Sequence, residues 1–118
     1  MLPKGITQLK VMWAIKDIPG SILDVKLKGI LFCFVALIGD SKKEWYFKSH
    51  KHLADIFGIS VRRLPDMLNA LEDLDFLIIN RPETYTKGDT NEYKLDYFLI
   101  LSTAARFREQ RVGRQNGR

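Results

Sequence analysis

Hydrophobic residues recur along this chain at the spacings of short helices and strands. Over residues 23–38 the apolar positions are three and four apart, which predicts a helix with a buried face. Residues 30–38 are apolar on nearly all sides, so this helix should lie at the centre of the core. A second leucine-rich stripe predicts another helix, which opens at Ser60 or Leu64 and runs to about Asp75.

Weaker patterns complete the chain. Residues 6–16 predict a short helix or strand packed on the core, and Trp13, Trp45 and Cys33 are expected to be core residues. The other expected elements are an edge strand at residues 45–47, a hairpin of residues 77–81 and 92–95 around a polar loop, a helix over 99–111 and a frayed end at 112–118.

Two amphipathic helices are separated by only three residues in the middle of the chain. Ser49 is the expected N-cap of a helix over residues 50–57, whose Leu53, Ala54, Ile56 and Phe57 should face inward. Gly58 can adopt the left-handed conformation that ends this helix, and Ser60 can cap the next turn. So short a connection predicts a helix-turn-helix.

The distribution of charge along the chain indicates a class of binding partner. The net charge is +5, and residues 104–118 hold five arginines against one glutamate. Residues 48–63 hold four basic residues against Asp55 alone. A basic tail beside a basic helix-turn-helix favours a polyanion, although basic tails also serve solubility alone.

The order helix, short strand, helix, turn, helix, strand, polar loop, strand resembles the winged helix-turn-helix. Residues 23–95 are similar to such domains in replication-initiation proteins of phages and plasmids and in related prokaryotic regulators. The matching positions are Trp45, the run Leu53-Ala54-Asp55-Ile56-Phe57-Gly58-Ile59-Ser60-Val61-Arg62-Arg63, then Leu68, Leu71-Glu72-Asp73-Leu74 and Leu77-Ile78.

This resemblance implies an α+β, mostly α fold: a winged helix-turn-helix with a three-helix core, a β-hairpin wing and an extra C-terminal helix. Residues 1–22 would be an N-terminal extension packed on the core, 23–98 the winged domain, and 99–118 a C-terminal helix and basic tail. The implied role is double-stranded DNA binding in replication initiation or transcription regulation, as a cytoplasmic homodimer.

The residues expected to contact DNA come from four places. Arginine can grip guanine or phosphate, asparagine can pair with adenine, and a helix N-terminus attracts phosphate. The candidates at the start of the helix over residues 50–57 (the second helix of the winged domain) are Lys48, Ser49, His50 and Lys51. Those in the turn and in the helix that follows it (the third helix) are Ser60, Arg62, Arg63 and Asn69. The wing adds Tyr85, Thr86 and Lys87, and the tail adds Arg106, Arg108 and Arg111.

Two residues depart from the pattern of these domains. Pro65 lacks an N–H, so the regular helix is expected to begin there, with residues 61–64 in a tighter turn that displays Arg62 and Arg63. Asp66 lies on or near the expected groove-facing side, where a carboxylate repels phosphate but could accept a hydrogen bond from cytosine.

The sequence favours no enzymatic chemistry. His50 and His52 are two residues apart, so they would point to different sides of a helix and make a poor metal pair. No phosphate-binding glycine loop or zinc-type cysteine cluster is present, and we expect no cofactor, metal, small-molecule substrate or membrane.

Two alternatives remain open. The chain could be a winged-helix protein-interaction or dimerisation module that does not read DNA, with residues 99–107 as its interface; Pro65, Asp66 and the acidic run Glu72, Asp73 and Asp75 favour this reading. The arginine tail could also bind single-stranded nucleic acid without sequence preference.

Overall fold

The chain folds as an α+β, mostly helical protein. A computed structural model describes the backbone of residues 1–83 and 90–116, with side chains in that part up to Gln110. Within it the elements are α1 (Gln8–Asp17), α2 (Val25–Asp40), β1 (Tyr46–Phe47), α3 (His50–Phe57), α4 (Leu64–Asp73), β2 (Leu77–Asn80), β3 (Glu92–Leu95) and α5 (Tyr97–Asn116).

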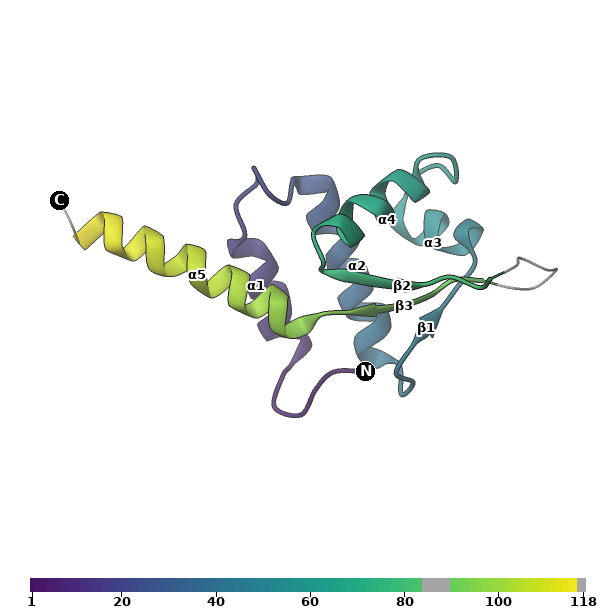
Figure 1. The fold of residues 1–118 in the computed structure, drawn as a ribbon, viewed down its shortest axis with the longest axis horizontal. Helices are drawn as coiled ribbons and strands as arrows, with labels where there is room; N and C mark the ends of the chain where they lie inside the picture. Colours follow the sequence, from purple (N-terminus) through teal and green to yellow (C-terminus); the bar gives the residue numbers. More distant parts are fainter. Residues whose placement is uncertain (84–89, 117–118) are drawn as a thin grey trace.

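The three strands form one antiparallel sheet in the order β1-β3-β2. Leu77 pairs with Leu95 and Asn80 with Glu92, so β2 and β3 form the hairpin that the sequence predicts. Tyr46 pairs with Tyr93, which places the predicted edge strand β1 on the other side of β3. The described base of the hairpin extends from the end of the molecule that also holds α3 and α4 (Figure 1).

Helix α2 lies at the centre of the core, as its apolar run predicts. It contacts α1 on one side and α3 and β3 on the other. Phe34 is fully buried in this second contact, with its ring centroid 5.1 Å from Phe57 and 5.6 Å from Tyr93. This aromatic cluster joins α2, α3 and the sheet.

Helices α1 and α5 pack side by side at the other end of the molecule (Figure 1). Val11, Ala14 and Ile15 of α1 and Ile100 and Ala104 of α5 are buried. Helix α5 then continues past α1 and away from the hairpin (Figure 1). The longest dimension of the molecule, 60 Å, results from this projection together with the hairpin at the opposite end.

Local sequence signals set most helix ends. The side chain of Asp24 accepts a hydrogen bond from the Leu27 N–H and caps α2. Helix α4 begins at Leu64, one of the two starts that the leucine pattern predicts, so Pro65 is its second residue and not its first as expected. An N–H is unneeded anywhere in a first helical turn, so proline fits the second position as well.

Two predicted core positions are wrong, and two others are only half-buried. Trp13 is 56% exposed, Ile56 is 43% exposed, and Cys33 is only half-buried. Trp13 lies on the side of α1 opposite its buried residues, where the Lys16 Nζ sits 3.8 Å from the ring centroid. Trp45 is half-buried and is covered in the same way by the Lys94 ammonium group.

Candidate nucleic-acid interface

The turn between α3 and α4 has the geometry that its sequence predicts. Gly58 has φ of 70°, in the left-handed region, and the Ile59 N–H donates to the Ala54 carbonyl at 3.1 Å. The Ser60 carbonyl then accepts from the Arg63 and Leu64 N–H groups, and the Ser60 Oγ accepts from the Arg63 N–H at 3.2 Å. These bonds close a tight turn ahead of α4.

Arg62 and Arg63 lie in this turn with exposed side chains. Among the described residues neither guanidinium has an ion-pair partner. An arginine with five free donors can bind a phosphate or the edge of a guanine. The turn therefore presents two unoccupied cations at the end of the molecule from which the hairpin extends (Figure 1).

Helix α3 ends at this turn, and its first residue lies one helix length, about 12 Å, before it. Ser49 caps it: its Oγ accepts from the His52 N–H at 3.3 Å and lies 2.6 Å from His52 Nδ1. Lys48 and Lys51 are exposed, whereas His50 is half-buried. The hydroxyl of Ser49 is thus used by the cap, and the two lysines are the groups that remain available to a polyanion.

Arg81, which follows β2 at the loop end of the hairpin, forms a side-chain cluster that the sequence pattern did not predict. Its guanidinium binds both carboxylate oxygens of Glu72, at 2.8 and 3.0 Å, and the Asn69 Oδ1 at 3.2 Å. The hydrogen bond from Arg81 lowers the pKa of Glu72. Pairing with adenine uses both the oxygen and the nitrogen of an amide, and the contact with Arg81 occupies one of the two lone pairs of the Asn69 Oδ1.

No sequence signal would have identified this cluster. Arg81 is nine residues from Glu72 and twelve from Asn69, and the three side chains meet only because β2 returns beside α4. The cluster ties the recognition-helix candidate α4 to the loop end of β2.

The exposed face of α4 is otherwise acidic. Asp66 and Asp73 are exposed, and Glu72 is paired with Arg81. Asp75 follows in a left-handed conformation, with φ of 65°. A phosphate backbone is attracted to the N-terminal turn of α4 by Arg62 and Arg63 and repelled along the rest of the helix.

The predicted wing and tail contacts differ in outcome. Tyr85, Thr86 and Lys87 lie outside the described residues, as does the side chain of Arg111. Arg108 donates from Nε to Asp17 Oδ2 at 2.8 Å, so this guanidinium is already paired with α1.

The structure does not bring the basic tail to the helix-turn-helix. Arg106 is exposed, but α5 carries it toward the end of the molecule opposite the hairpin (Figure 1). Helix α5 packs on α1, so contact of the tail with DNA stays a prediction that is separate from the contacts of the α3–α4 turn.

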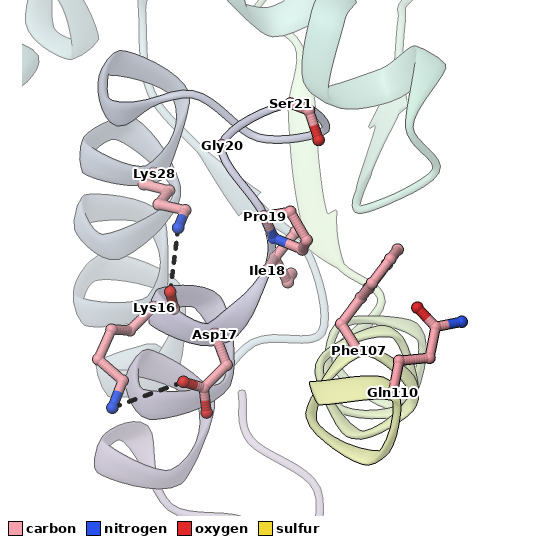
Figure 2. Close-up of a pocket in the computed structure, with 9 residues that line it drawn as sticks. All are labelled: Lys16, Asp17, Ile18, Pro19, Gly20, Ser21, Lys28, Phe107 and Gln110. Carbon is pink, nitrogen blue, oxygen red and sulfur yellow. Dashed lines mark hydrogen bonds and ion pairs between the residues drawn. The ribbon is translucent and has the colours of Figure 1, made fainter. Parts of the chain in front are cut away.

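A hollow of about 520 Å³ lies between the α1–α2 connection and α5 (Figure 2). Its charged groups already have partners: Lys28 Nζ donates to the Lys16 carbonyl at 3.0 Å, and Lys16 Nζ lies 3.5 Å from Asp17 Oδ1. Phe107 and Gln110 close the α5 side (Figure 2). The hollow offers a ligand no unpaired charged side chain among its lining residues.

Comparisons with known proteins do not assign this chain to a family. No protein-family model, curated protein or solved structure matches this chain. Among the described residues no three histidine, cysteine or carboxylate side chains gather as metal ligands. No helix in the described part of the chain is both long and apolar enough to cross a membrane.

Proposed function

We propose that this chain is a winged-helix protein that binds double-stranded DNA. The observation that supports this most is the α3–α4 turn, which presents Arg62 and Arg63 without ion-pair partners among the described residues, while the start of α3 exposes Lys48 and Lys51. The order of elements and the antiparallel β2–β3 hairpin after α4 are compatible with a winged helix. The role in replication initiation or transcription regulation of a phage, plasmid or other prokaryotic mobile element, in the cytoplasm, rests on the sequence resemblance.

The distribution of charge limits how the duplex would be bound. Arg62 and Arg63 would hold phosphates or a guanine edge at the start of α4, and Lys48 and Lys51 would hold neighbouring phosphates. Asp66 and Asp73 disfavour burial of the whole of α4 in the groove. Base reading would therefore be confined to the first turn of α4.

Selection of duplexes from a random DNA pool at two salt concentrations tests this proposal. We expect an enriched motif at both salts, because a guanine contact carries sequence information. The selected duplex is then titrated with the Arg62→Ala, Arg63→Ala double variant. Loss of two cationic contacts should weaken binding and reduce the slope of log affinity against log salt by about 2.

Lys26→Ala is the control, since it removes an exposed cation from the first turn of α2, away from every residue expected to contact DNA. It should leave affinity and slope unchanged, with the helix content of every variant checked by circular dichroism. Absence of binding to any duplex at low salt, or binding that survives the double variant, would contradict the proposal.

A second function, a protein-interaction module that does not read DNA, is favoured by one observation. The exposed face of α4 carries Asp66 and Asp73 where a groove-binding helix usually carries cations or amides. The duplex selection separates the two functions, because an interaction module recovers no duplex at either salt.

A further inference from the structure

The face of the β-sheet that turns away from the core carries exposed apolar side chains. Directly opposite residues of paired antiparallel strands lie on the same face, so Phe47 shares a face with Glu92. Ile78 shares one with Lys94 in the same way. Glu92 and Lys94 are two residues apart on β3, so the two pairs lie on one face, and Tyr93 between them is fully buried on the other. On this outer sheet face Phe47 is 50% exposed and Ile78 38%.

Two aromatic rings on the outer sheet face each have a lysine ammonium group over them. Trp45 comes two residues before Phe47, which places both rings on this face. The Lys94 Nζ lies 4.6 Å from the Trp45 ring centroid, which agrees with that placement. The Lys43 Nζ lies 5.0 Å from the Phe47 ring centroid. Each ring therefore has a flexible, solvated side chain over one of its faces.

The charge around the two rings is positive. Residues 42–48 hold three lysines and one glutamate, all of them exposed. The glutamate, Glu44, lies 3.4 Å from the Lys94 Nζ, whereas the three lysines have no ion-pair partner among the described residues. The other carboxylate on the face, that of Glu92, accepts a hydrogen bond from the Asn80 amide. Aromatic rings interleaved with cations suit a polymer that alternates flat bases with phosphates.

We propose that the outer sheet face binds single-stranded nucleic acid, with bases stacked on Trp45 and Phe47 and phosphates held by Lys43 and Lys94. A base stacked on an aromatic side chain contributes more than an exposed cation–π contact does. A base can therefore take the place of the ammonium group over each ring, and the displaced lysine can bind the adjacent phosphate.

The outer sheet face lies apart from the proposed duplex site. Strand β1 forms one edge of the sheet, whereas α4 packs beside β2, at the other edge (Figure 1). The paired bases of a duplex are stacked on each other and cannot lie on the two rings, whereas the unpaired bases of a single strand can. The inference therefore uses neither Arg62 nor Arg63 and does not depend on duplex binding.

Titration of the full chain with a short labelled oligothymidylate and a short labelled oligouridylate, followed by fluorescence anisotropy at low salt, tests the site. We expect saturable binding, and the comparison of the two probes shows whether the face accepts DNA, RNA or both. Trp45→Leu and Phe47→Leu should each raise the dissociation constant about tenfold, because each removes one stacked base. Trp13→Leu is the matched control, since this 56% exposed tryptophan lies on α1, outside the sheet, and its loss should change nothing.

Two further measurements remain decisive if the leucine variants are unstable. Lys43→Gln with Lys94→Gln should reduce the slope of log affinity against log salt by about 1.4, because a single strand loses two phosphate contacts. The chain has two tryptophans, so in a Trp13→Phe chain all indole emission comes from Trp45. A base stacked on Trp45 should quench that emission, and the Trp45→Phe chain should show no quenching.

Absence of binding to both oligonucleotides at low salt overturns the proposal and leaves the face to a protein partner. Binding that is unchanged in the Trp45→Leu and Phe47→Leu variants also overturns it, because another segment, such as the arginine tail, then holds the strand. The Arg62→Ala, Arg63→Ala double variant should still bind the oligonucleotides. Failure of the outer sheet face and failure of duplex binding are therefore separate results.

Discussion

The two ends of this molecule differ in the groups that they leave exposed. At the end with the helix-turn-helix, Arg62 and Arg63 are exposed without ion-pair partners among the described residues, and Asp66 and Asp73 follow on α4. At the end with α1 and α5, Arg108 is tied to Asp17, and the aromatic side chain of Trp13 is 56% exposed. Exposed arginines without partners suit a polyanion, whereas exposed aromatics suit a dry interface.

The comparison also shows that the arginines of this chain have two different roles. The sequence has arginines at both ends and gives them the same weight. In the structure Arg108 joins α5 to α1 with a 2.8 Å ion pair, and Arg81 joins the hairpin to α4, so both guanidinium groups stabilise packing. Arg62 and Arg63 make no such contact, which is why they carry the proposed function.

The largest expected effect is a loss of folding stability at the aromatic cluster that joins the two ends. Phe34 of α2 is fully buried against Phe57 and Tyr93. Phe34→Ala should lower the free energy of unfolding by about 3–5 kcal/mol, because the cavity lies between three elements that cannot collapse together. Denaturant unfolding followed by circular dichroism measures this, with Phe34→Leu as a milder control; a loss below about 1 kcal/mol for the alanine variant would contradict a rigid aromatic cluster.

Local signals explain why so much of the fold is predictable. The bounds of α3 follow from Ser49 and Gly58, which cap its two ends through their own side chain or backbone conformation. The start of α2 follows from Asp24 in the same way, and β3 matches the predicted residues 92–95. Each of these signals acts within a few residues, so no knowledge of the tertiary structure was needed.

Helix α1 shows where local signals fail. Leu9, Met12 and Trp13 lie on one side and Val11, Ala14 and Ile15 on the other, so both sides are apolar. The sequence pattern cannot choose between them, and the larger Trp13 was wrongly assigned to the core. The choice is made by α2 and α5, which pack against the side with the smaller residues.

The candidate site also has one part that the local sequence predicts and one part that it does not. The exposed turn with Arg62 and Arg63 was predicted from Gly58, Ser60 and Pro65, which are adjacent in sequence. The Arg81 cluster was not predicted, because it depends on how β2 returns beside α4. Contact of any of these residues with DNA remains a prediction.

A smaller effect, on DNA affinity, is expected from the acidic face of α4. If this face lies beside a bound duplex, Asp66→Asn with Asp73→Asn should tighten DNA binding about three- to tenfold at low salt, because two repulsive charges are removed. Asp40→Asn at the end of α2 is the matched control, since it removes the same charge elsewhere and keeps the oxygen that accepts from Gln8. Titration of the selected duplex measures both; equal affinity for all three proteins would mean that α4 stays away from the DNA.

The smallest expected effect is on the free energy of unfolding, and it comes from the ion pair between Arg81 and Glu72. The hydrogen bond from Arg81 lowers the folded-state pKa of Glu72 below its ordinary value of 4.5. A lowered pKa means that the pair stabilises the fold above pH 4.5 and that this contribution is lost as the pH falls through the folded-state pKa. Because both side chains are substantially exposed, solvent screening limits the contribution to less than about 1 kcal/mol.

Glu72→Gln should therefore lower the free energy of unfolding slightly at neutral pH and leave it unchanged in strong acid, where the native glutamate is protonated as well. Denaturant unfolding at both pH values measures this difference. Arg108→Gln provides the comparison from the other end, since it breaks the 2.8 Å contact between α5 and α1 without altering α4. If Glu72→Gln were equally destabilising at both pH values, packing of the side chain instead of its charge would hold the hairpin to α4.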